Sequence, residues 1–194
     1  MMPRQWFASL LMFTLASLPG AAEALAQVAI PEAEITLIRA IGFIEGPRFI
    51  ARACTRANPS SAAGWDREVA EFEQRRAGEA ALARKLFAET YSKAVPEQEA
   101  LAILGAKVDD RIEQEAAAKH LGAGTLCLVV ALVGGKRAFE TKGFEETMQS
   151  LEHFEQTGEY ARLKARIAVA TPSEKAQYRE RLLAYQPKPV NTQK

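Results

Sequence analysis

Residues Thr125–Val133 read Thr-Leu-Cys-Leu-Val-Val-Ala-Leu-Val, the longest uncharged apolar run in the chain outside its N-terminal stretch. This run is too short to cross a bilayer as a helix, which needs about 20 apolar residues. Other parts of the chain must therefore cover it, because exposure forfeits roughly 25 cal/mol per Å² of apolar surface. We expect a central buried element with amphipathic helices packed around it.

The secondary structure of Leu126–Val133 is ambiguous from sequence, since short apolar runs occur in strands and in buried helices. Valine favours a strand. A strand needs a partner, however, and only Glu34–Ile38 and Ala165–Ala170 are candidates, both of them poor. We therefore predict a short buried helix that is capped by Thr125 and ends at Gly134–Gly135.

Residues 1–26 have the pattern of an export signal. Arg4 supplies a positive start, Trp6–Leu18 forms an apolar stretch, and small residues follow. Two cleavage positions fit the small-x-small rule, one after Ala22–Ala24 and one after Ala24–Ala26, and we favour the second. The alternative is a retained membrane anchor. It fits less well because the apolar stretch is short and a cleavage pattern follows it.

Cleavage after residue 26 leaves one domain over residues 27–186 and a polar tail over residues 187–194 that we expect to be disordered. We expect this mature chain to be periplasmic or secreted. The whole chain has a net charge of +1 and no basic run, which argues against a nucleic-acid partner. The polar faces of its helices mix both signs, so we expect no stable membrane insertion after cleavage.

The chain has only two cysteines, Cys54 and Cys127, which lie 73 positions apart. In an oxidising compartment two cysteines favour pairing, so we predict a Cys54–Cys127 disulfide. Closing so long a loop should stabilise the fold by roughly 2–4 kcal/mol. Two buried free thiols are the alternative. A redox-active pair is less favoured still, since the sequence has no Cys-x-x-Cys.

Apolar residues recur at helical spacing through the rest of the mature chain, so we predict an all-α bundle of about six helices around the short buried helix. The predicted segments are Glu34–Ala57, kinked or divided at Pro47; one long helix from Ser60 or Ser61 to Tyr91; Pro96 to His120–Gly122; Phe144–Phe154; Tyr160–Ile167; and Thr171–Ala184. The last begins with the clearest local signal, because Thr171, Pro172 and Glu174 have the spacing of a capping box.

The sequence contains no pattern that predicts a catalytic, cofactor-binding or metal-ligating residue. His120 and His153 lack the glutamate three positions earlier that helical metal sites use. Asp109, Asp110 and Glu113 lack the glycine-containing calcium loop and fit a solvated helix face. Gly-x-Ser-x-Gly is absent, and Gly134-Gly135-Lys136 lacks the spacing of a phosphate loop.

The sequence therefore favours an exported, non-catalytic helical module that binds an envelope protein or a small ligand, neither of them identified by the sequence. The alternative is an envelope hydrolase that acts on cell-wall material through paired carboxylates, which distant positions can supply. A cleft with two carboxyl groups at catalytic separation, one with a raised pKa, would favour the hydrolase.

Overall fold

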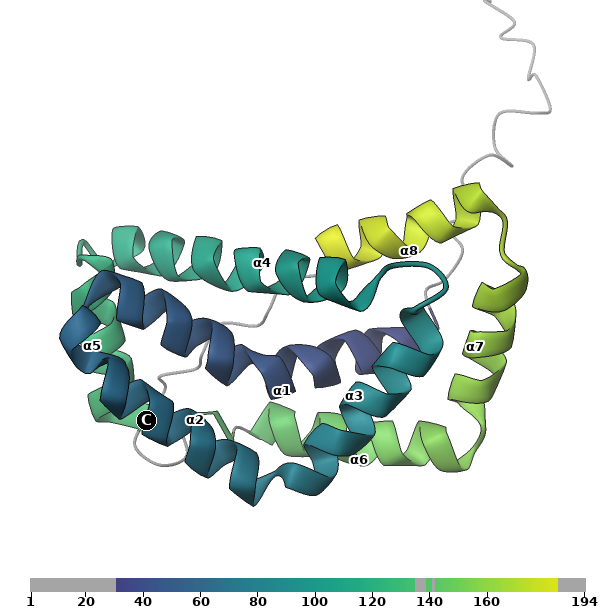
Figure 1. Ribbon diagram of the computed structural model, residues 1–194, viewed down its shortest axis with the longest axis horizontal. Helices are drawn as coiled ribbons and strands as arrows, with labels where there is room; N and C mark the ends of the chain where they lie inside the picture. The colour runs from purple at the N-terminus through teal and green to yellow at the C-terminus, as the bar shows by residue number, and fades with distance from the viewer. Residues whose placement is uncertain (1–30, 135–138, 141, 185–194) are drawn as a thin grey trace, which may run out of the picture.

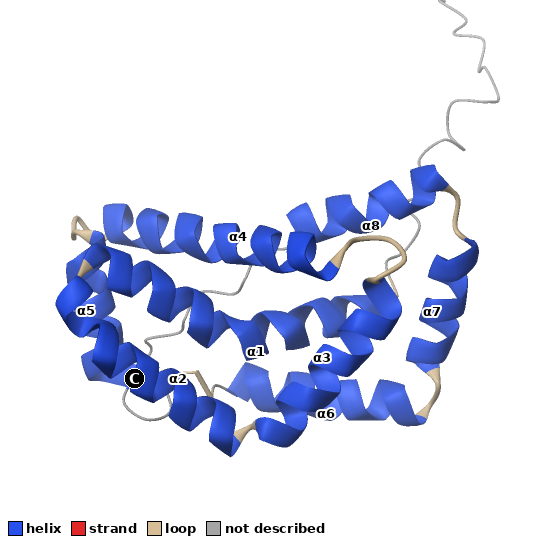
Figure 2. Cartoon of the chain, in the orientation of Figure 1, coloured by secondary structure: helices blue, strands red, loops and turns tan. Residues whose placement is uncertain are grey.

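The computed structural model describes residues 31–134, 139, 140 and 142–184 (Figure 1). These residues form eight α-helices and one short 3-10 helix, and no strand occurs among them, so the predicted all-α bundle is confirmed (Figure 2). The elements are α1 (Glu32–Ala57), η1 (Pro59–Ser61), α2 (Ala62–Arg75), α3 (Ala77–Tyr91), α4 (Glu97–Ala118), α5 (Ala123–Gly134), α6 (Lys142–Gln156), α7 (Glu159–Val169) and α8 (Pro172–Ala184). The predicted export signal and the tail over 187–194 lie outside the described residues.

Helix α1 is the centre of the bundle. It runs through the middle of the molecule and packs against α2, α3, α4, α5, α6 and α7 (Figure 1). Fourteen of its 26 residues are buried. The core around it is completed by large side chains from five other helices, namely Phe72, Phe87, Tyr91, Phe144, Leu151, Leu163, Ile167 and Leu182. A helix that buries apolar side chains around most of its circumference has to be surrounded.

The apolar run that starts at Thr125 does form a helix, but its predicted central position is wrong. Helix α5 lies at one end of the molecule and packs against α1 and α4 (Figure 1). Leu126 and Cys127 are buried, whereas Leu128 is 55% exposed. The physical reason is length: α5 has 12 residues and offers much less surface to neighbouring helices than α1, which has 26.

The number of helices exceeds the prediction because the long helix expected from Ser60 or Ser61 to Tyr91 is divided. It becomes η1, α2 and α3, and Arg76 leaves the helical conformation between the last two with φ −114°. At Pro47 the opposite holds. Helix α1 continues through this residue, so the predicted alternative of a new helix starting there is wrong. Buried packing on both sides of Pro47 outweighs the hydrogen bond that proline removes.

The start of α8 and the end of α4 show where nearby residues in the sequence determine the conformation of a helix end and where they do not. At α8 the Thr171 N–H donates to Glu174 Oε2 at 2.7 Å, and the Glu174 N–H donates to Thr171 Oγ1 at 3.3 Å. The predicted capping box is therefore confirmed. After α4, His120 adopts the left-handed conformation with φ 55°, which residues other than glycine rarely take.

Candidate functional site

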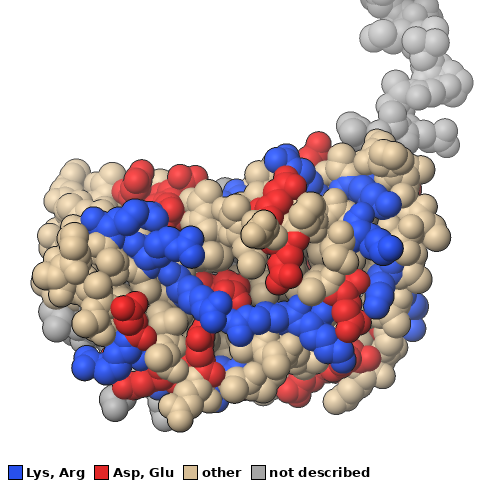
Figure 3. All heavy atoms as spheres, viewed as in Figure 1, with Lys and Arg blue, Asp and Glu red and all other residues tan. Residues whose placement is uncertain are grey.

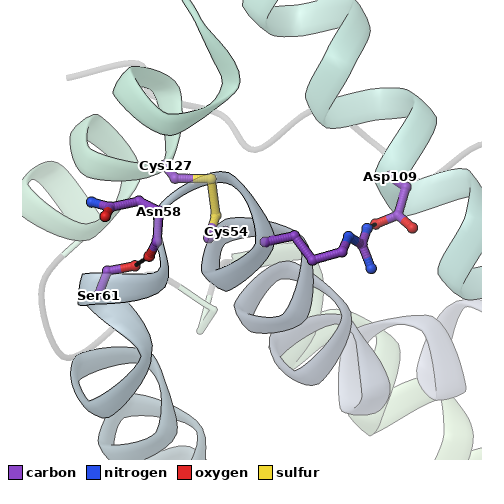
Figure 4. Close-up of a disulfide and its surroundings, with 6 residues drawn as sticks. Cys54, Asn58, Ser61, Asp109 and Cys127 are labelled. Carbon is purple, nitrogen blue, oxygen red and sulfur yellow. Dashed lines mark hydrogen bonds and ion pairs between the residues drawn. A yellow bond between two sulfur atoms is a disulfide. The ribbon is translucent and has the colours of Figure 1, made fainter.

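The two cysteines meet where the end of α1 approaches α5 (Figure 4). Their sulfur atoms are 2.04 Å apart and their Cα atoms 5.5 Å apart, within the range that a disulfide requires. Cys54 and Cys127 are buried with Ala51 and Trp65 in a small apolar cluster of their own. Trp65 is thus part of the core beside the disulfide.

The histidines and carboxylates that the sequence offered as candidates do not come together in one site. His120 and His153 are both exposed. Asp109 forms an ion pair with Arg56 at 2.7 Å. Within the described part of the chain, no group of three or more His, Cys, Asp or Glu side chains is arranged to hold a metal ion. Lys136 lies outside the described residues.

The buried carboxylates are each bound by arginine. Glu34 accepts hydrogen bonds from Arg181 at 2.5 and 3.2 Å, and Glu45 accepts one from Arg84 at 2.6 Å. Arginine or hydrogen bonds at a helix start lower the pKa of the carboxyl groups of Glu140, Glu159 and Glu174. None of these shifts is the raised carboxyl pKa that would favour the hydrolase.

Glu140 illustrates how arginine sets these values. Burial of its carboxyl group by itself raises the pKa, but hydrogen bonds from Arg75 and Arg76 outweigh that effect and lower it. Arg76 also lies over the ring of Phe144, with 4.9 Å between Cζ and the ring centroid. This cluster fastens the α2–α3 junction to Glu140 and to the first turn of α6.

The exposed residues of α1 are the most distinctive feature of the surface. From Pro47 to its end, the exposed residues of α1 are Arg48, Arg52, Arg56 and Ala57. The three arginines are four residues apart, so they lie in one row with a step of about 6 Å. We call these three side chains the arginine face.

Acidic residues of neighbouring helices hold the two outer arginines. Arg48 Nε lies 2.5 Å from Glu73 Oε1 of α2, and Arg56 Nη2 lies 2.7 Å from Asp109 Oδ1 of α4 (Figure 4 shows Asp109 directed toward α1). The arginine face therefore runs between α2 and α4. Arg52, in the middle of the row, has no ion-pair partner among the described residues.

A fourth arginine, outside the row, strengthens one end of it. Arg84 of α3 binds the buried Glu45 of α1, and its Nη2 lies 3.6 Å from Glu73 Oε1. Arg48 also reaches Glu45, at 3.4 Å. The side-chain hydrogen bond with Glu73 is the main reason that the pKa of Arg48 is raised, which keeps its guanidinium charged. Two arginines and two glutamates thus fix α1, α2 and α3 to one another.

Figure 3 shows the result on the surface. A band of Lys and Arg crosses the side of the molecule on which α1 lies between α4 and the α2–α3 pair, with Asp and Glu beside it. These arginines form no basic run in the sequence, because three uncharged residues separate each from the next. Their four-residue spacing was visible, but the sequence did not show which side of α1 stays uncovered.

Comparisons with family models, with curated proteins and with solved structures find no match to this chain. Among the described helices, none combines the length and the apolar character that a membrane crossing requires.

Proposed function

We propose that this chain is an exported, non-catalytic helical module that binds another protein in the bacterial envelope, and that the arginine face is its binding surface. The observation that carries the proposal is the exposure of Arg48, Arg52 and Arg56 in one row on a helix that packs against six others. An uncovered strip on the central helix of a bundle is reached by a partner without any rearrangement of the core.

Export is supported by two independent features. Residues 1–26 have the composition of a cleaved leader. The Cys54–Cys127 pair has disulfide geometry, which agrees with an oxidising compartment. The envelope is the first such compartment that an exported bacterial chain enters.

Binding is favoured over catalysis by the chemistry of the surface. Arginine keeps its proton at every pH that a protein experiences, so it serves neither as a general acid nor as a general base. Its planar guanidinium instead offers several donors in a fixed geometry, which suits recognition. The carboxylates beside the row, Glu45, Glu73 and Asp109, are already engaged by arginine.

Affinity capture from the envelope fraction tests this function. The tagged protein, an Arg52→Glu variant and an Arg166→Glu variant are compared by quantitative mass spectrometry. Arg166 is an exposed arginine of α7 and provides the matched control. We expect a partner protein that the unaltered chain and Arg166→Glu retain and that Arg52→Glu loses. Equal capture by all three chains, or no specific partner, would rule out the arginine face as the binding surface.

A further inference from the structure

The arginine face has the chemistry and spacing to recognise carboxylates. We propose that its ligand is an acidic segment of the partner protein, whose Asp or Glu side chains pair with Arg48, Arg52 and Arg56. This inference rests on the proposed function and adds the chemical class of the partner surface.

The residue type points to carboxylates. Every basic residue of α1 is arginine, and lysine does not occur in that helix. The guanidinium fork of arginine matches a carboxylate through two parallel N–H···O bonds, whereas a lysine ammonium acts as a point charge. The molecule already uses this pairing, since the Arg181 guanidinium binds both oxygens of Glu34.

The arrangement leaves the central arginine available. Glu73 and Asp109 draw Arg48 toward α2 and Arg56 toward α4, which orders these two side chains before any ligand arrives. Arg52 lies between them with its donors unused by the described residues. An ordered side chain loses less conformational entropy on binding. The two outer arginines are therefore already ordered when a ligand arrives, and Arg52 offers that ligand the donors that no other described side chain uses.

The spacing fits a protein segment. Successive arginines of the row are about 6 Å apart along the axis of α1. Carboxylates four residues apart on a partner helix have the same spacing, because both helices share one rise per residue. A partner helix that lies along α1 can therefore match the row position by position.

The local charge argues against a polyanion. Four arginines (Arg48, Arg52, Arg56 and Arg84) lie beside three carboxylates, two at the surface (Glu73 and Asp109) and one buried beneath it (Glu45), so the net charge of these seven groups is only +1. Nucleic acids and polyphosphates are bound by many uncompensated positive charges and depend steeply on salt. A helix that binds a bilayer surface inserts a broad apolar face beside a polar face rich in lysine or arginine, whereas the apolar side chains of α1 are largely buried in the bundle. Discrete pairing with a few carboxylates suits this mixed surface better.

Nuclear magnetic resonance of the isotope-labelled protein tests the proposal. The probe is a synthetic peptide of four Glu-Ala-Ala-Ala repeats, and the matched control peptide has Gln in place of each Glu. We expect the arginine Nε–H signals of the arginine face to shift with the Glu peptide and to stay unchanged with the Gln peptide. Arg52→Gln should weaken binding by at least about fivefold, as loss of a charge-assisted hydrogen bond does, whereas Arg166→Gln should leave it unchanged.

Sodium polyphosphate and phosphatidylglycerol vesicles are the competing probes. We expect both to bind more weakly than the Glu peptide. Stronger binding of either probe, equal shifts with the two peptides, or unchanged affinity in Arg52→Gln would overturn the inference. The proposed function is tested separately, by the affinity capture. If that capture finds an Arg52-dependent partner while the Glu peptide does not bind, the proposed function stands and only the inferred acidic character of the partner surface is wrong.

Discussion

Replacing Cys54 and Cys127 together with alanine should lower the free energy of unfolding by about 2–5 kcal/mol, the range for loss of a native disulfide from a small domain. The bridge closes a loop of 73 positions, so its removal frees much of the unfolded chain. The loss of stability should be largest in α5, because α1 and α4 are the only described helices that contact it extensively. Urea unfolding gives the total, and hydrogen exchange over Ala123–Gly134 locates it.

The control for this variant is Leu128→Ala, one position from the bridge. Leu128 is 55% exposed, so its truncation should change stability by no more than about 0.5 kcal/mol. If the double alanine variant unfolds at the same urea concentration as the unaltered protein, the bridge is not a stabilising element. Intact-mass analysis before reduction that found two free thiols would show that it does not form.

Replacing Arg181 with alanine should cost about 3–5 kcal/mol, because it leaves a buried carboxylate without its counter-charge. The Glu34 side chain is 1% exposed, and Arg181 binds both of its oxygens. The remaining donor is the Tyr91 hydroxyl at 3.0 Å, which carries no charge to balance the carboxylate. The variant should show a lowered urea midpoint and early exchange of the α8 amides.

Arg179→Ala on the same helix is a matched control for Arg181→Ala. Arg179 pairs with Glu99 at 2.5 Å, but the two side chains are 51% and 39% exposed. An exposed ion pair contributes only about 0–1 kcal/mol, so this variant should remain close to the unaltered protein. Equal losses from the two substitutions would mean that burial of Glu34 does not set the strength of its ion pair.

Local chemistry allowed several features to be predicted from the sequence. The capping box of α8 needs only Thr171 and Glu174 at the right spacing, and both hydrogen bonds form. The all-α fold follows from apolar residues at helical spacing. In each case the residues that decide the structure are close together in the chain.

The predictions that failed depend on contacts between distant residues. The central position given to the run from Thr125 rested on hydrophobicity alone, whereas the centre goes to α1, the helix with the most surface to bury. The division at Arg76 was missed because its partners Glu140 and Glu145 are more than 60 positions away. The exposure of Arg48, Arg52 and Arg56 likewise depends on where α2 and α4 pack.

The central claim is that the partner meets the molecule at the arginine face. Site-specific photo-crosslinking in intact cells tests it most directly, with benzoylphenylalanine in place of Ala57, an exposed residue next to Arg56 that leaves all three arginines intact. Val169 of α7, which is 84% exposed, is the control position. We expect one protein adduct from position 57 that Arg52→Glu abolishes and no adduct from position 169. An adduct from both positions, or one from position 57 that survives Arg52→Glu, would contradict the claim.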